Sequence, residues 1–226
     1  MTKQLSQLQS SIMKEIVAEL TKLSKYSFTT PSVSHSTSTT TDIWLYAQDF
    51  AIQVEIDWRH WDVLFSVIRL EDGQHPNGYA VSNGRPCRAY LSQLLKRKKW
   101  YTQTHDLSAA RSRPKRPNDK MPRPTDQPDA ARTVLLEVFR EELALLTDFA
   151  EVLIAEQAHL FPTASEYEQA QNEAAFRRAH AKSTQARQHQ NFAEVVSLLT
   201  PYEHQLSDAK LKLLAYSRHR LACEQA

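Results

Sequence analysis

A run of nine residues, Phe50 to Trp58, alternates between apolar and other side chains, and it constrains the fold more than any other feature. The apolar positions are Phe50, Ile52, Val54, Ile56 and Trp58. Successive side chains of a strand point to opposite faces of its sheet, so a repeat of two predicts a strand with one buried face. The other face carries Ala51, Gln53, Glu55, Asp57 and, beyond the strand, Arg59.

Further strands are predicted on both sides of this one. Ile43–Ala47 precedes it, and Val63–Leu70 follows it and is apolar on both faces, which is typical of a central strand. Tyr79–Ser82 is a fourth short candidate after the turn signals Asp72-Gly73 and Pro76-Asn77-Gly78. The Ser- and Thr-rich stretch Tyr26–Thr41 reads as an extended loop or an irregular edge strand.

Two helices accompany these strands. Apolar residues recur at steps of three and four from Leu5 to Leu23, which predicts an amphipathic helix over about Leu5–Ser24. A second helix is predicted over Arg88–Trp100, with cations near its end. The first hundred residues therefore predict an α+β domain, an N-terminal helix followed by an antiparallel four-stranded meander.

Charge and proline content divide the chain after residue 100. Lys96 to Arg123 holds ten basic and two acidic residues, so the rest of the chain has a net charge of −6 although the whole has +2. Thr102–Pro128 also holds five of the ten prolines and almost no large apolar residue. We predict three parts, namely an α+β domain over 1–100, a basic proline-rich linker over 101–128 and a helical domain over 129–226.

The last hundred residues predict helices throughout. Asp129 is a suitable N-cap for a long helix reaching about His159, and Thr163 to Glu166 has the spacing of a capping box for the next helix, ending near Gln188. Asn191–Leu199 and Ser207–Ala222 complete the set.

Part of this helical region resembles one tetratricopeptide-type helical pair. The matching positions are Phe176, Ala179, Ala186, Phe192, Val195, Val196, Leu198, Leu199 and Pro201. The small residue that such a motif has at its inter-helix turn is replaced near His189, and no second copy follows. The resemblance implies a helical hairpin used for packing or for gripping a partner.

The segment Ile43–Cys87 loosely resembles small bacterial interaction proteins, including the immunity proteins that neutralise toxins. That resemblance implies a non-catalytic protein that binds another protein. The sequence has only three glycines, too few for a glycine-rich phosphate loop. We expect no cofactor. The N-terminus has no signal-peptide pattern and no apolar run could span a membrane, so we expect a cytoplasmic protein.

Three groups of residues are candidate sites. Trp58, His60 and Trp61 crowd the turn after the alternating strand, where they could form a partner-binding surface or cap the core. Glu55 and Asp57 share a strand face and could bind a divalent metal in a hydrolase, or could simply face water.

The third group could bind nucleic acid, because cations release counterions from phosphate and aromatic rings stack on bases. Its residues are Lys96, Arg97, Lys98, Lys99, Arg111, Arg113, Lys115 and Arg116, beside Trp100 and Tyr101. The alternative is that this segment is a linker without a binding role, whose charge keeps it solvated. No residue is predicted to be catalytic.

Overall fold

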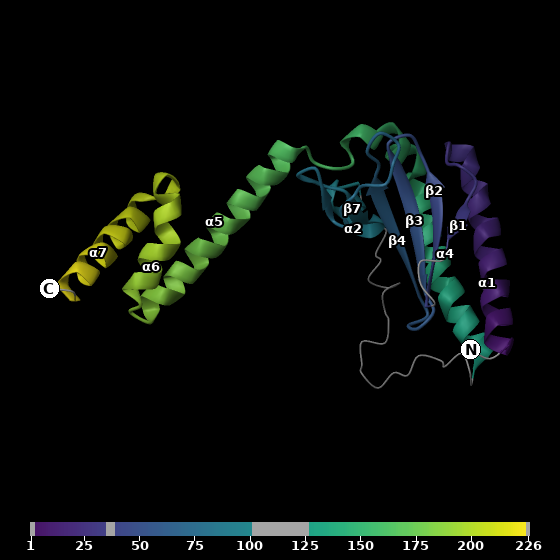
Figure 1. The fold of residues 1–226 in the computed structure, drawn as a ribbon, viewed down its shortest axis with the longest axis horizontal. Helices are drawn as coiled ribbons and strands as arrows, with labels where there is room; N and C mark the ends of the chain where they lie inside the picture. Colours follow the sequence, from purple (N-terminus) through teal and green to yellow (C-terminus); the bar gives the residue numbers. More distant parts are fainter. Residues whose placement is uncertain (1–2, 35–38, 101–126, 225–226) are drawn as a thin grey trace. The chain divides into compact units, whose positions relative to one another are not determined.

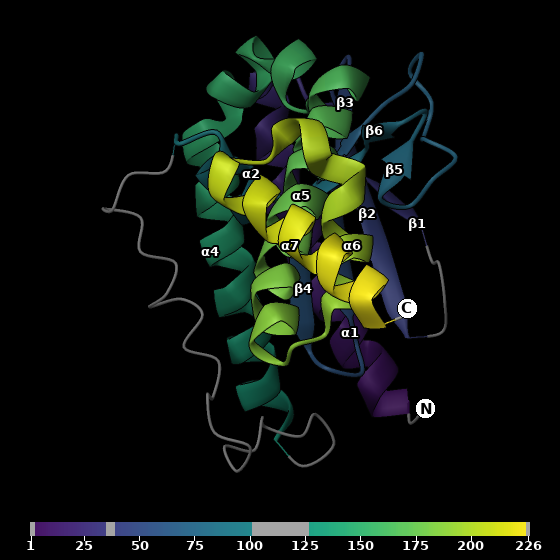
Figure 2. The ribbon, with the colours of Figure 1, turned by 90° about the vertical axis from the view of Figure 1, so that its left-hand side faces the viewer.

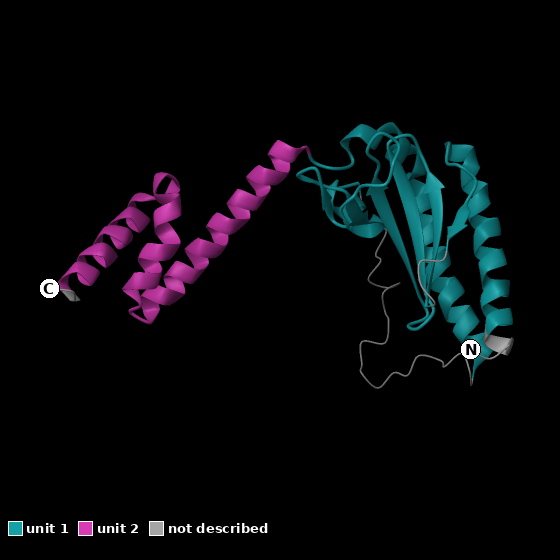
Figure 3. Cartoon of the chain, in the orientation of Figure 1, with its two compact units in different colours: residues 1–162 teal, residues 163–226 magenta. Residues whose placement is uncertain are grey.

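A computed structural model describes residues 3–34, 39–100 and 127–224. The chain divides into two compact units, Met1–Pro162 and Thr163–Ala226 (Figure 3). None of the helices in the described ranges is long and apolar enough to cross a membrane.

The first unit contains a fully antiparallel five-stranded sheet with the order β1-β2-β3-β4-β7 (Figure 1). Its strands are β1 (Ser32–Ser34), β2 (Thr40–Tyr46), β3 (Phe50–Asp57), β4 (Asp62–Arg69) and β7 (Arg88–Tyr90). The predicted alternating strand is β3, and its neighbours β2 and β4 confirm the meander. β1 confirms the alternative of an edge strand in the Ser- and Thr-rich stretch.

The predicted fourth strand lies elsewhere. Only Val81–Ser82 of that segment is a strand, β5, and it pairs with β6 (Arg85–Pro86) in a separate small sheet. The main sheet instead takes β7, the first three residues of the segment predicted as a helix; α2 (Leu91–Arg97) follows at once. Gly78 allows the connecting loop to close, because a Cβ there would lie 1.9 Å from the carbonyl oxygen of Val81.

Two long helices lie side by side along one face of this sheet (Figures 1 and 2). They are α1 (Lys3–Thr21), which continues into η1 (Lys22–Tyr26), and α4 (Pro128–Ala155), which is followed by η2 (Gln157–His159). Ile12 and Ile16 of α1 and Phe139 of α4 are almost fully buried in the same cluster as the apolar side chains of β2, β3 and β4. The ring of Phe139 lies 5.9 Å from that of Phe65 on β4.

α4 therefore belongs to the sheet unit, whereas the sequence predicted a domain boundary at residue 129. An apolar stripe on a helix predicts burial without indicating against what. Glu15 of α1 also pairs with Arg132 at 2.6 Å and Arg140 at 2.7 Å, so ion pairs join the two helices as well. The observed division falls at residue 162, just before the capping box.

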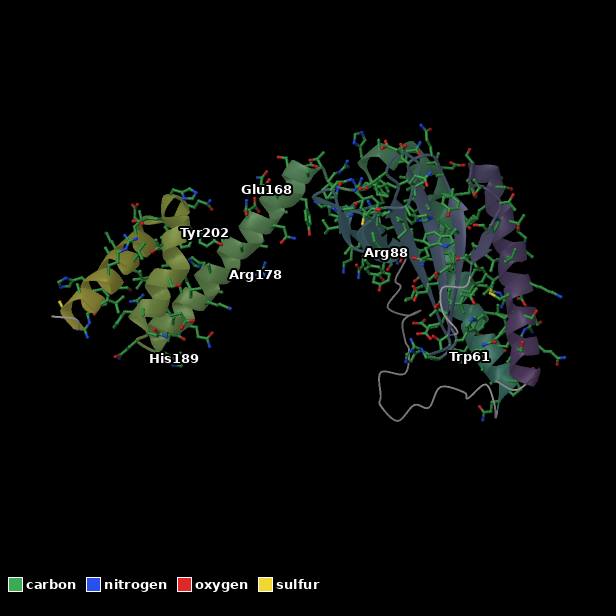
Figure 4. The ribbon with its side chains drawn as sticks, in the orientation of Figure 1. Trp61, Arg88, Glu168, Arg178, His189 and Tyr202 are labelled. Atoms are coloured by element: carbon green, nitrogen blue, oxygen red, sulfur yellow. The ribbon has the colours of Figure 1, made fainter. Side chains whose placement is uncertain are left out.

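The second unit is helical: α5 (Ala164–Gln188), α6 (Phe192–Leu199), η3 (Thr200–Gln205) and α7 (Asp208–Glu224). Thr163 and Glu166 form the predicted capping box, and Asn191 caps α6. Val195, Leu199 and Leu214 form a small core against the C-terminal half of α5. The ring of Phe176 on α5 contacts the ring of Tyr202, with centroids 5.5 Å apart; Tyr202 is labelled in Figure 4.

Replacing Phe139 with alanine tests the assignment of α4 to the sheet. Because this ring is 1 % exposed, Phe139→Ala should lower the free energy of unfolding by about 3–5 kcal/mol, measured by urea denaturation. Val152→Ala on the same helix removes a side chain that is 37 % exposed and should have a much smaller effect. Equal effects of the two substitutions would contradict this packing.

An open face of the sheet as candidate binding site

The two faces of the main sheet differ in what covers them. The face built on Ile43, Val54 and Phe65 lies in the apolar cluster that also holds the buried residues of α1, α2 and α4. The apolar residues of the opposite side, Ala51, Leu64 and Ile68, do not belong to that cluster, although Ala51 and Ile68 are buried. We call that side the open face; it consists of Ser32, Ser34, Thr40, Asp42, Trp44, Tyr46, Ala51, Gln53, Glu55, Asp57, Asp62, Leu64, Ser66, Ile68, Arg88 and Tyr90.

The strand register arranges this face in rows. The central row crosses all five strands through directly opposed pairs: Ser32, Trp44, Gln53, Ser66 and Tyr90. Directly opposed residues of antiparallel strands share a face and have Cβ atoms about 4.5–5.5 Å apart. A tryptophan, an amide, a hydroxyl and a tyrosine therefore form one continuous strip.

Carboxylates gather on one side of the central row. The next row holds Asp42 opposite Glu55, and the row beyond it holds Asp57 opposite Asp62. We call these four residues the acidic rows. The pKa of Glu55 is raised, first by burial and then by the charge of Asp42; Arg88 opposes this, and Asp57 and Asp62 add to it.

Gln53 is the middle residue of the central row, next to the acidic rows, and is only 5 % exposed. Its Nε2 donates a hydrogen bond of 2.9 Å to Oδ1 of Asp42. Its Oε1 is buried and accepts no hydrogen bond from the residues that the structure describes. A buried acceptor without a donor destabilises a fold by about 1–3 kcal/mol, so an unpaired oxygen at the centre of a sheet requires an explanation.

Aromatic rings gather on the other side of the central row. Trp44 stacks on Tyr46 at 6.4 Å, and His75 contacts Trp44 edge-on at 4.4 Å and shares a hydrogen bond of 2.9 Å with the Tyr46 hydroxyl. Tyr79 is 72 % exposed, and the guanidinium of Arg88 lies over its ring at 4.3 Å. His75, Tyr79 and Arg88, together with Ile68, line a hollow of about 280 Å³.

The loop that carries His75 and Tyr79 is held by Glu71. One oxygen of this carboxylate accepts from Arg69 at 2.7 Å, and the other accepts from Ser82 and Asn83, each at 2.9 Å. Both members of the Arg69–Glu71 pair are largely buried. The aromatic end of the open face is thus fixed by hydrogen bonds to β4 and β5.

The predicted partner-binding turn has a different arrangement. Trp61 is 5 % exposed with φ of 52°, and its ring contacts Trp58 at 5.7 Å at one end of the sheet (Figure 4). Trp58 is partly buried and donates from Nε1 to Thr41. The two indoles cap the core, the alternative that the sequence left open, and partner binding at this turn stays a prediction. His60 alone is well exposed.

The predicted metal ligands Glu55 and Asp57 lie on the open face, but Asp57 has other partners. Its Oδ1 accepts from the backbone N–H groups of Arg59 and His60, and its Oδ2 bonds Nδ1 of His60 at 2.7 Å. Burial raises the pKa of Asp57, but these hydrogen bonds outweigh burial and lower it. In the part of the chain that the structure describes, no three His, Cys, Asp or Glu residues could together hold a metal ion.

The basic residues predicted to contact nucleic acid are partly engaged within the fold. Arg97 donates to the carbonyl of Leu160 at 3.4 Å, and Lys98 donates to the carbonyl of His159, so both attach α2 to the segment after α4. Lys96 and Lys99 are exposed. The remaining four, Arg111, Arg113, Lys115 and Arg116, lie outside the described residues.

No model of a known protein family, no curated protein and no solved structure matches this chain. The residues of the open face therefore have to be interpreted from their own geometry.

The raised pKa of Glu55 predicts how stability depends on pH. The ionised form is disfavoured in the folded state, so Glu55 is compatible with folding below its ordinary value of 4.5 and destabilises the fold as pH rises through its raised pKa. Glu55→Gln should therefore raise the melting temperature at pH 7, and the gain should shrink as pH falls through the raised pKa and be lost below the ordinary value of 4.5. Glu151→Gln, an exposed substitution on α4, should show no such trend.

Proposed function

We propose that this chain is a non-catalytic protein-binding module and that the open face is its binding surface. The observation that carries the proposal is the central row, in which Trp44 and Tyr90 flank the buried polar pair Gln53 and Ser66 across the full width of the sheet. Trp and Tyr are enriched at protein interfaces because they offer large apolar area together with a polar group.

The charge of the open face favours a protein over a nucleic acid. The acidic rows place four carboxylates there, and phosphate groups would be repelled by them. The face is also broad and carries both exposed aromatic rings and polar groups, whereas a small-molecule site is a concave, mostly apolar cleft.

The chemistry of the unit's cysteine supports a binding role as well. Cys87 is buried, burial raises the pKa of its thiol, and the thiol donates to the carbonyl of Gly78 at 3.2 Å. A nucleophilic cysteine needs the opposite conditions, a lowered pKa and access to substrate.

We further propose that the protein has an inhibitor- or immunity-type role, exercised in the cytoplasm.

Site-specific photocrosslinking tests this function. With p-benzoylphenylalanine at position 90, where the native tyrosine is 42 % exposed, irradiation in the source cells should give a covalent adduct with one protein. The same group at Lys14, exposed on α1, should not give that adduct. Adding Trp44→Ala should reduce the yield because it removes a large part of the contact area.

Two results would contradict the proposal. One is the absence of a protein adduct at position 90, or the same adducts at both positions. The other is an adduct that nuclease treatment removes, which would identify a nucleic acid as the partner.

A further inference from the structure

Four residues meet where the central row joins the acidic rows, and together they have the chemistry of a cation site. Gln53 lies directly opposite Trp44, and Asp42 lies directly opposite Glu55. The hydrogen bond from Gln53 to Asp42 runs diagonally and links the two pairs. We call these four residues the Gln53 site.

The orientation of the Gln53 amide shows which kind of group is missing. An ionised carboxylate only accepts hydrogen bonds, so the –NH₂ end of the amide must face Asp42. The oxygen end is then fixed as well; it is buried and has no donor within the described ranges. Only a ligand that donates hydrogen bonds would satisfy it.

The charges around Gln53 favour a positively charged donor. Asp42 is 7 % exposed and directly opposes Glu55, and like charges in opposed positions destabilise a sheet. The raised pKa of Glu55 has the same origin in burial and neighbouring carboxylates. Arg88 is the cation that acts on Glu55 in the described part of the chain, but its guanidinium lies over the ring of Tyr79.

Trp44 adds an aromatic surface beside these acceptors. Its Nε1 donates to Ser34 and its ring contacts His75, so the half-buried indole is held in place. A guanidinium stacks on aromatic faces and presents planar donors that match carboxylates, whereas an ammonium is a compact, strongly hydrated charge.

We propose that the Gln53 site binds an arginine side chain presented by a basic segment of the protein partner. Because Oε1 of Gln53 is buried in the free protein, the amide must shift for the guanidinium to donate to it; the guanidinium also donates to the carboxylates of Asp42 and Glu55 and packs beside Trp44. This inference rests on the proposed function and specifies the partner's chemistry.

The test uses the full-length protein and a fluorescein-labelled peptide in which arginine alternates with serine. Binding is followed by fluorescence anisotropy at about 150 mM salt, where screening limits long-range attraction to about 8 Å. The arginine peptide should bind, and peptides with lysine or uncharged citrulline in place of arginine should bind at least about tenfold more weakly.

Substitutions in the site separate specific binding from general attraction. Glu55→Gln and Gln53→Met should each weaken the arginine peptide about tenfold or more, since each removes a hydrogen bond to a charged group. Glu151→Gln makes the same charge change on the helical side and should leave affinity unchanged. Circular dichroism confirms that each variant is folded.

The inference is overturned if the lysine or citrulline peptide binds as well as the arginine peptide, or if Glu55→Gln and Glu151→Gln behave alike. It is also overturned if the peptide binds only after Arg111, Arg113, Lys115 and Arg116 are replaced by glutamine, which would identify the chain's own basic segment as the occupant. A photocrosslinked adduct at position 90 without arginine-peptide binding would contradict this inference alone and leave the proposed function standing.

Discussion

The packing of α1 and α4 on one face of the five-stranded sheet is the constraint on which the rest of the first unit depends. Phe139 against Phe65 and the ion pairs of Glu15 with Arg132 and Arg140 hold the two helices to the sheet and to each other. A sheet with apolar cover on one side presents polar groups on the other. The alternation of apolar and other side chains in β3 reflects this one-sided cover in the sequence.

The open face is more than a wetted surface. A solvated sheet face would carry exposed, independent polar side chains, yet Asp42, Gln53 and Ser66 are all less than a tenth exposed. Gln53 leaves an acceptor unpaired, and Glu55 is held among like charges. Both features lower stability, and a surface that retains such groups is expected where binding supplies the missing partners.

Local sequence patterns predicted most elements but not their partners. The alternation over Phe50–Trp58 predicted β3 and its buried face, and the capping box at Thr163 predicted the start of α5. The attachment of α4 to the sheet was missed because an apolar helical stripe does not specify what it packs against. β7 was missed because three residues before a helix carry too little pattern to register as a strand.

Only part of the open face could be predicted from the sequence. Its residues in β3 were recognised as one face, but their interpretation as solvent-facing missed the burial of Gln53, which depends on neighbours in β2 and β4. The sequence left open whether Trp58 and Trp61 bind a partner or cap the core, and their packing on the core emerges only from the fold. Aromatic rings and charges identify candidate surfaces; strand register decides which of them share one.

Hydroxyl-radical footprinting with mass spectrometry tests the central claim, that one face of the sheet is covered and the other is open. In the free protein we expect ready oxidation of Tyr90 and Tyr79, intermediate oxidation of Trp44 and Tyr46, and protection of Phe65 and Phe139. Protection of Trp44, Tyr46 and Tyr90 to the level of Phe139 would show that this face is covered, and would contradict the account.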